Sequence, residues 1–200
     1  MSDASVLKDN LPNDLLWRLS VDKYHEMIRA GILSENDHVE LIEGWLVEKM
    51  PNNPAHTYST ERSRETVEHV LPKGYFVNVQ QPITTATSES EPDVAVIRGS
   101  REAYLAHHPY PENIALIIEV SDSTLKYDRT TKQRLYAKAG VKLYWIVNLV
   151  EKQLEIYTQP SSEKGIYEVV TTYNLDEQVP FIIDDHEVTQ LLVRDFFPRA

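Results

Sequence analysis

The sequence predicts a single α/β domain with a central mixed sheet flanked by helices. The segments NIALIIEV (113–120) and LYWIVNL (143–149) are almost continuously apolar, which is typical of central strands covered on both faces. A helical pattern near 129–139 lies between them, so we expect a parallel, right-handed crossover. The length of 200 residues also favours one domain, 1–200, with added arms.

The N-terminal part predicts an arm followed by a helix and a hairpin. Residues 1–19 mix Asp, Asn and Pro with a few apolar side chains, and we expect them to form the arm. Within 20–55, Ser20 precedes an apolar stripe at helical spacing and is the expected N-cap. Two short β-rich runs then meet at Glu43 and Gly44, where the glycine permits the positive φ of a tight turn.

Residues 56–149 predict the core, in the order helix, three strands, helix, strand. The first helix is expected to end at Pro72, and the strands before 113 are YFVNVQQPI (75–83) and PDVAVI (92–97). Residues 150–200 predict a C-terminal β extension with two β runs and a short final element. This order of predicted helices and strands favours one α/β core with additions at both ends.

Composition excludes several classes of function. A net charge of -11 argues against a protein whose whole surface binds nucleic acid or an anionic membrane. The chain has no cysteine, which rules out disulfides, thiolate zinc sites and cysteine nucleophiles, so any metal must bind oxygen or imidazole ligands. We find no secretory signal or membrane-spanning run, and we expect a cytoplasmic protein without a membrane partner.

Two carboxylates occupy the ends of predicted strands. Glu119 interrupts a strongly apolar run, and a buried carboxylate is costly unless it is paired, protonated or bound to a cation. Asp93 stands at the start of the preceding strand, so the two meet if these strands are neighbours. Such a pair favours Mg²⁺ or Mn²⁺. The alternative is that each residue simply ends its strand in solvent.

A lysine on the following helix is the third candidate. Lys132 falls on the apolar stripe formed by Leu135, Tyr136 and Ala139, and lysine is rarely buried without a partner. The segment 126–142 contains six basic residues and one acidic residue, so a basic patch is expected beside the carboxylates. Alternatively, the Lys132 stem packs while its ammonium reaches water, and the charged segment is a solvated helix face.

Several of these residues form a pattern that resembles a known family. The pattern consists of Pro92-Asp93, Glu119-Val120-Ser121, Tyr127-Asp128-x-x-x-Lys132-x-x-x-Tyr136-Ala137-x-Ala139-Gly140-Val141 and Tyr144-Trp145-Ile146-Val147. It closely resembles the Uma-type family, whose members are regarded as endonucleases of the PD-(D/E)XK superfamily. Similarity continues upstream through Glu40 to Gly44 and Pro54-x-His56, so it spans residues 20–150. The resemblance implies a restriction-endonuclease-like core.

The resemblance also implies roles for individual residues. Asp93 and Glu119 are the expected metal ligands, with the carbonyl of Val120 as a further one. The superfamily places its lysine two residues after the glutamate, where this chain has Ser121, so Lys132 is expected to supply the ammonium. Further candidates are Lys126 as the alternative lysine, His56 in place of a glutamate on the first helix, Glu40 and Asp128.

These residues lead to a functional hypothesis with two alternatives. We expect a Mg²⁺-dependent or Mn²⁺-dependent endonuclease that hydrolyses DNA, with Asp93, Glu119 and Lys132 as catalytic residues. Its DNA binding should be weak and salt-dependent, and a homodimer is expected because two strands need two sites. The alternatives are an inactive nuclease-fold module that binds DNA or protein, and a metal hydrolase of small phosphorylated molecules.

Overall fold

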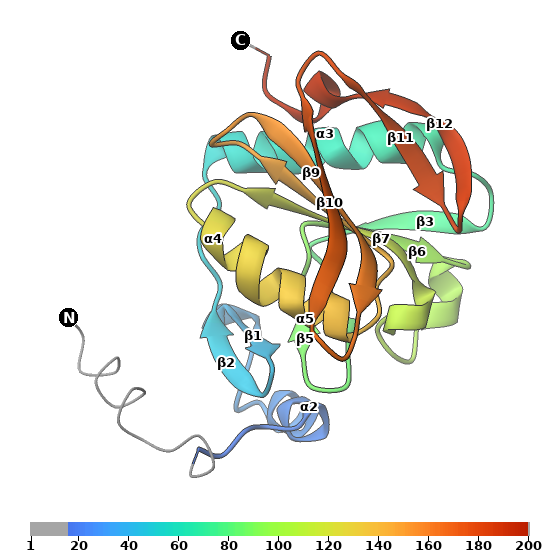
Figure 1. The fold of residues 1–200 in the computed structure, drawn as a ribbon. Coiled ribbons are helices and arrows are strands. Elements are labelled where there is room, and N and C mark those ends of the chain that lie inside the picture. Colours follow the sequence, from blue (N-terminus) through green and yellow to red (C-terminus); the bar gives the residue numbers. More distant parts are fainter. Residues whose placement is uncertain (1–15, 200) are drawn as a thin grey trace.

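A computed structural model of the chain describes residues 16–199 (Figure 1). Most of the predicted N-terminal arm, residues 1–15, lies outside the described residues. Helix α2 (Val21–Arg29) begins as predicted, because the Ser20 side chain accepts a hydrogen bond from the backbone N–H of Lys23. No helix within residues 16–199 is long and apolar enough to cross a membrane.

The predicted hairpin follows, and it belongs to a small second sheet. Strands β1 (Val39–Ile42) and β2 (Trp45–Glu48) are joined by Glu43 and Gly44, which both have positive φ. The order of this sheet is β2-β1-β5-β4, with short strands β4 (Ile83–Thr84) and β5 (Glu89–Ser90). Pairing of β1 with β5 places the N-terminal hairpin beside the segment that leads into the central sheet.

The central sheet has six strands in the order β10-β9-β8-β7-β6-β3. Their bounds are β3 (Tyr75–Val79), β6 (Val94–Arg98), β7 (Ile114–Ser121), β8 (Leu143–Asn148), β9 (Gln153–Ser161) and β10 (Ile166–Asn174). Strands β7 and β8 are parallel and the other neighbours are antiparallel, so the predicted mixed sheet is confirmed. Two strands of the expected C-terminal extension, β9 and β10, therefore continue the central sheet.

Helices cover both faces of this sheet (Figure 1). Helix α3 (Pro54–Val70) packs with one apolar cluster, which contains Val94, Val96 and Val120. The other cluster contains Ala95 and residues of helix α5 (Gln133–Lys138). Neighbouring strand residues point to opposite faces and both faces are covered, which explains why the central strands are almost continuously apolar.

The crossover between β7 and β8 contains an irregular helix. It begins with α4 (Leu125–Tyr127), continues through a π-helical turn (Asp128–Lys132) and ends with α5. The predicted helix near 129–139 is thus present, but the wide turn in it was not predicted. Wide turns of this kind are frequent at functional sites because they change which side chains share a face.

The C-terminal residues form a separate hairpin on the α3 side of the sheet (Figure 1). It consists of β11 (Gln178–Ile183) and β12 (His186–Leu192), and a short 3-10 turn follows (Val193–Phe196). Phe181 and Phe196 pack edge-on against Trp145 in the core. Strand β11 was missing from the sequence-based prediction, in which proline and turn residues obscured the β pattern.

Candidate active site

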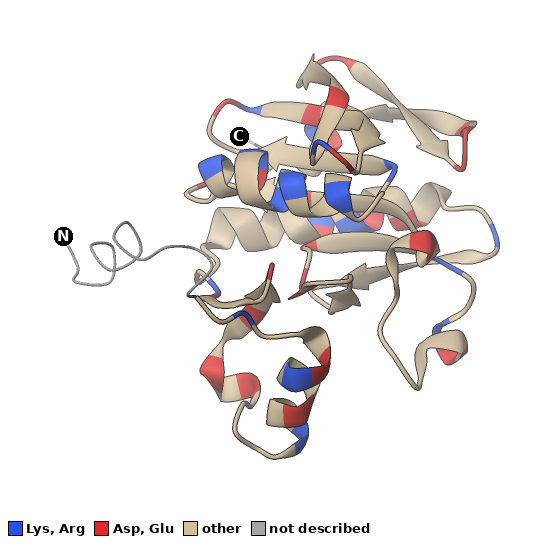
Figure 2. Ribbon diagram, turned by 60° about the horizontal axis from the view of Figure 1, so that its bottom comes forward, with Lys and Arg blue, Asp and Glu red and all other residues tan. Residues whose placement is uncertain are grey.

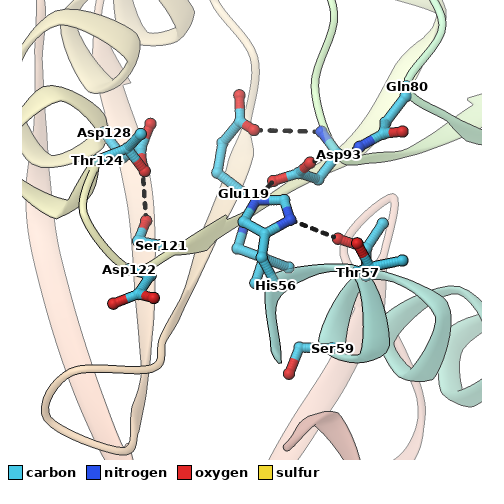
Figure 3. A network of polar contacts seen from close by, with 12 residues as sticks. His56, Thr57, Ser59, Gln80, Asp93, Glu119, Ser121, Asp122, Thr124 and Asp128 are labelled. Atoms are coloured by element: carbon cyan, nitrogen blue, oxygen red, sulfur yellow. Dashed lines mark hydrogen bonds and ion pairs between the residues drawn. The ribbon is translucent and has the colours of Figure 1, made fainter. Parts of the chain in front are cut away.

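Asp93 and Glu119 meet at one end of the central sheet. Strands β6 and β7 are antiparallel neighbours, so the residue that precedes β6 lies beside the end of β7. The backbone N–H of Asp93 donates to Glu119 Oε2 over 3.2 Å (Figure 3). The backbone N–H of Val120 donates to Asp93 Oδ2 over 2.9 Å. Both residues are buried, with an exposed fraction of 8% for Asp93 and 5% for Glu119.

Helix α3 brings His56 to the same point. Asn53 caps the helix by accepting a hydrogen bond from the His56 backbone N–H, which directs the first turn toward the sheet end. His56 Nε2 lies 3.1 Å from Asp93 Oδ2. Burial by itself would lower the pKa of His56, but the hydrogen bond and charge of Asp93 outweigh it and raise that pKa above its usual value. His56 therefore orients the Asp93 carboxylate.

Lys132 lies on the other side of Glu119. Glu119 lies on the face of the central sheet that α5 covers, so its side chain points toward the crossover helix. Lys132 Nζ is 3.7 Å from Glu119 Oε1 and 2.9 Å from Glu40 Oε2. Burial opposes the charge on Lys132, but the carboxylates of Glu119 and Glu40 raise its pKa above the usual value. The ammonium is buried and remains protonated.

Ser121 and Asp128 form a neighbouring pair. The hydroxyl of Ser121 and that of Thr124 each donate to Asp128 Oδ2 over 2.7 Å. Burial raises the pKa of Asp128, while these hydroxyls and the charge of Lys132 lower it. Ser121 occupies the position expected for the superfamily lysine. It supplies no charge there, and its hydroxyl instead holds the Asp128 carboxylate at the cleft.

One cleft, with a volume of about 600 Å³, is lined by His56, Asp93, Glu119, Asp128 and Lys132. It lies between the N-terminal hairpin, the start of α3, the end of β7 and the crossover helix. The acidic residues that line it are Glu40, Glu48, Glu91, Asp93, Glu119, Asp122 and Asp128, and the lysines are Lys49 and Lys132. Such an excess of negative charge favours a bound cation.

Comparison with protein families identifies the chain. The family model Uma2, described as "Putative restriction endonuclease", matches residues 21–183. The chain belongs to the Uma2 family. The match covers the cleft residues and most of the C-terminal strands, so it extends beyond the resemblance seen in the sequence over 20–150.

A solved structure has the same fold as this Uma2 protein. It is described as the crystal structure of "a putative nuclease belonging to DUF820" from Anabaena variabilis ATCC 29413. The TM-score is 0.66 at 17% sequence identity, over 90% of this chain and 97% of that chain. Among curated proteins, none matches the chain at a significant level. The predicted α/β fold with a central mixed sheet flanked by helices is confirmed.

The donor set of the Uma2 cleft suits a hard divalent cation. Asp93 and Glu119 offer carboxylate oxygens, and burial together with the charges of Asp93 and Asp128 raises the pKa of Glu119 although Lys132 opposes the rise. Within residues 16–199, no group of three or more His, Asp or Glu side chains converges as a metal cage. Mg²⁺ commonly binds one or two carboxylates together with water and phosphate, so two carboxylates and the Val120 carbonyl fit this ion.

The two candidate lysines lie in different surroundings. Lys132 is buried in the cleft, whereas Lys126 is exposed and does not line it. The geometry therefore favours Lys132 as the lysine beside the carboxylates. Glu40 and His56 were further candidates in the sequence, and both line the cleft. Glu40 contacts Lys132, and His56 contacts Asp93.

The expected basic patch is largely neutralised, and this part of the prediction is wrong. Of the six cations in 126–142, all except Lys126 form an ion pair with a described residue. Arg134 and Lys138 both pair with Glu43 of the hairpin turn, and Arg129 pairs with the buried Glu155. Figure 2 shows Lys and Arg in blue and Asp and Glu in red, with positions of both charges on neighbouring helices, strands and turns. The free cationic surface is smaller than the sequence indicated.

Sequence reasoning missed three residues that support the site. Gln80 Nε2 donates to Asp93 Oδ1 over 3.3 Å, and the Tyr136 hydroxyl donates to Glu119 Oε1 over 2.6 Å. Thr124 helps to hold Asp128. Tyr136 lies one turn after Lys132 on the same helical stripe, which was a usable signal, whereas nothing local in the sequence marks Gln80.

Proposed function

We propose that this Uma2 protein is a metal-dependent endonuclease that hydrolyses phosphodiester bonds of DNA. The observation that carries the proposal is the meeting of Asp93 and Glu119 at the sheet end, with the Lys132 ammonium 3.7 Å from Glu119. Two carboxylates and a lysine in one acidic cleft combine oxygen ligands for a cation with a positive charge for a phosphate. The family description is in agreement with this chemistry.

In the proposed reaction, Asp93, Glu119 and the Val120 carbonyl hold Mg²⁺ or Mn²⁺. When bound, the ion supplies Lewis acidity and an activated water. His56 fixes the orientation of Asp93, and Tyr136 fixes that of Glu119. Lys132, kept charged by its two carboxylate neighbours, orients the attacking water or stabilises charge on the phosphate.

DNA binding is proposed to be weak and salt-dependent. Ion pairs occupy most cations of the crossover segment, so few remain to contact the phosphate backbone. We propose a homodimer as the active form, because cleavage of both strands of a duplex requires two sites. Sedimentation of the protein with and without a duplex tests this arrangement.

The experiment that tests the function is a cleavage assay with plasmid and single-stranded DNA. Wild type should cut in Mg²⁺ or Mn²⁺ and be inactive in EDTA. Asp93→Asn, Glu119→Gln and Lys132→Ala should each lose at least about a hundredfold in rate, because each removes a group placed at the reacting centre. Lys126→Ala is the matched control and should retain the wild-type rate.

The results separate several explanations. No cleavage by wild type in either metal contradicts the proposed function. Loss of activity in the Lys126 variant with retention in the Lys132 variant contradicts the choice of lysine. Circular dichroism of each variant shows whether a lost activity comes from the site or from a lost fold.

A second candidate function is a nuclease-fold module that binds DNA or protein without catalysis. The observation that favours it is the engagement of both carboxylates in hydrogen bonds within the protein, to Val120, His56 and Tyr136 among others. Such a module would bind DNA in Mg²⁺ and leave it intact. The same cleavage assay, combined with a gel-shift measurement, distinguishes the two functions.

A further inference from the structure

One buried hydroxyl in the cleft has no hydrogen-bond partner within the protein. Among residues 16–199, the buried side-chain atoms without a partner are Ser59 Oγ, Ser90 Oγ, Tyr127 Oη and Trp145 Nε1. Tyr127 is the member of this set that lines the cleft. A buried polar atom without a partner is unfavourable, and such an atom at a functional cleft indicates a contact made with a ligand.

The position of Tyr127 connects it to the candidate active site. It is the last residue of α4, directly before the π-helical turn that ends at Lys132. Tyr127 and Lys132 are five residues apart at the two ends of this wide turn, and both line the cleft. The wide turn thus aligns a hydroxyl with the buried ammonium.

The Tyr127 hydroxyl is a donor at neutral pH. Burial raises the pKa of Tyr127 to about 12, and the negative charge of Glu40 adds to the effect. The hydroxyl consequently keeps its proton. Lys132 Nζ already donates to Glu40 Oε2, so its donors are partly engaged, whereas the Tyr127 donor is not.

We propose that the Tyr127 hydroxyl donates a hydrogen bond to a non-bridging phosphate oxygen of the substrate, beside Lys132. This inference rests on the proposed function, because it takes a phosphodiester as the ligand of the cleft. An anionic phosphate oxygen is a strong acceptor, and it would satisfy the one buried cleft hydroxyl that the described residues leave without a partner. Tyr127 is thereby assigned a direct substrate contact.

Tyr127→Phe tests this assignment because it removes one oxygen atom and no internal hydrogen bond. We would measure the Kd of a fluorescein-labelled single-stranded oligonucleotide by anisotropy in Ca²⁺, which takes the same oxygen ligands as Mg²⁺. A gel of the same samples verifies that the oligonucleotide stays intact. The Kd should rise by about tenfold or more, as expected for a hydrogen bond to a charged group. The melting temperature should be unchanged or higher.

Tyr167→Phe is the matched control. The Tyr167 hydroxyl is also buried, but it donates to the carbonyl of Val141 over 2.8 Å and lies outside the cleft. This variant should have a lower melting temperature and a wild-type Kd. The pair of variants therefore separates a hydroxyl that contacts the substrate from one that stabilises the fold.

Each outcome bears on the inference. A wild-type Kd for Tyr127→Phe overturns it, and so does a melting temperature lowered as much as that of Tyr167→Phe. A wild type that binds no oligonucleotide overturns it as well. If wild type binds but never cleaves, and Tyr127→Phe binds more weakly, the contact is supported while the proposed endonuclease activity fails. If wild type cleaves and Tyr127→Phe binds equally well, the activity is supported and the contact is wrong.

Discussion

The ammonium of Lys132 lies 2.9 Å from Oε2 of Glu40, although 92 residues separate them in the sequence. Both side chains are less than one-tenth exposed. Glu40 comes from β1 of the small sheet, and Lys132 comes from the crossover helix of the central sheet. This ion pair therefore connects the N-terminal hairpin to the candidate catalytic lysine.

Glu40→Gln should lower the free energy of unfolding by about 3 kcal/mol, because it removes the nearer carboxylate of a buried ion pair and leaves the Lys132 ammonium with only the more distant Glu119. Urea denaturation of wild type and variant measures the change. The double variant Glu40→Gln/Lys132→Met should recover little of this loss, since it also removes the ammonium partner of the buried Glu119 carboxylate. Glu168→Gln is the control, because its exposed pair with Lys164 should contribute less than about 1 kcal/mol. Equal effects of the two single variants would contradict the importance of burial.

Mn²⁺ should raise the melting temperature of wild type, because a ligand that binds the folded state stabilises it according to its occupancy. At a concentration of about 100 times Kd, the gain is about 2.7 kcal/mol. Asp93→Asn and Glu119→Gln should abolish the rise, and EDTA should reverse it in wild type. Glu168→Gln, which lies outside the cleft, should respond like wild type. A constant melting temperature across millimolar Mn²⁺ would speak against the proposed metal site.

Glu43→Gln should strengthen nucleic-acid binding. Glu43 lies 2.7 Å from Arg134 and 3.1 Å from Lys138, so loss of its charge frees two cations on α5. Affinity for duplex DNA should rise, and the slope of log K against log salt should steepen by about 0.9 for each new phosphate contact. Salt-dependent anisotropy measures both quantities. An unchanged slope would show that α5 does not face the nucleic acid.

Asp184 should make stability depend on acidic pH. Hydrogen bonds from Arg98 are the main reason why the pKa of Asp184 falls from 3.8 to about 2, although burial opposes them. The stabilisation is therefore present above pH 3.8 and is lost as the pH falls through about 2. Because the pair is partly exposed, we expect about 1 kcal/mol.

The measurement for Asp184 is the difference in unfolding free energy between wild type and Asp184→Asn across acidic pH. Asn retains the size of the side chain and tolerates the positive φ of 48° at this turn. The difference should shrink below pH 3.8. A difference that stays constant down to the acid transition would contradict the assignment of the shift to this carboxyl.

Local patterns in the sequence were sufficient for the central architecture. Two almost continuously apolar runs indicated strands β7 and β8, and their parallel pairing is confirmed. Glu119 is the single carboxylate in the first run, and Lys132 is the lysine on the apolar stripe of the next helix. These two residues lie beside each other. These features could be predicted because burial requires apolar side chains at regular spacing, so that a charged residue on a buried face is visible as an exception.

Long-range contacts decided the remaining features. The pairing of β1 with β5 brings Glu40 to Lys132, and Glu43 neutralises Arg134 from the same hairpin. The π-helical turn connects Tyr127 to Lys132, and both residues line the cleft. Periodicity describes which side of an element faces the core, but it does not specify which distant residue lies opposite. The sequence thus indicated the carboxylates and the lysine, whereas the partners of that lysine and the loss of the basic patch depend on how separate segments pack together.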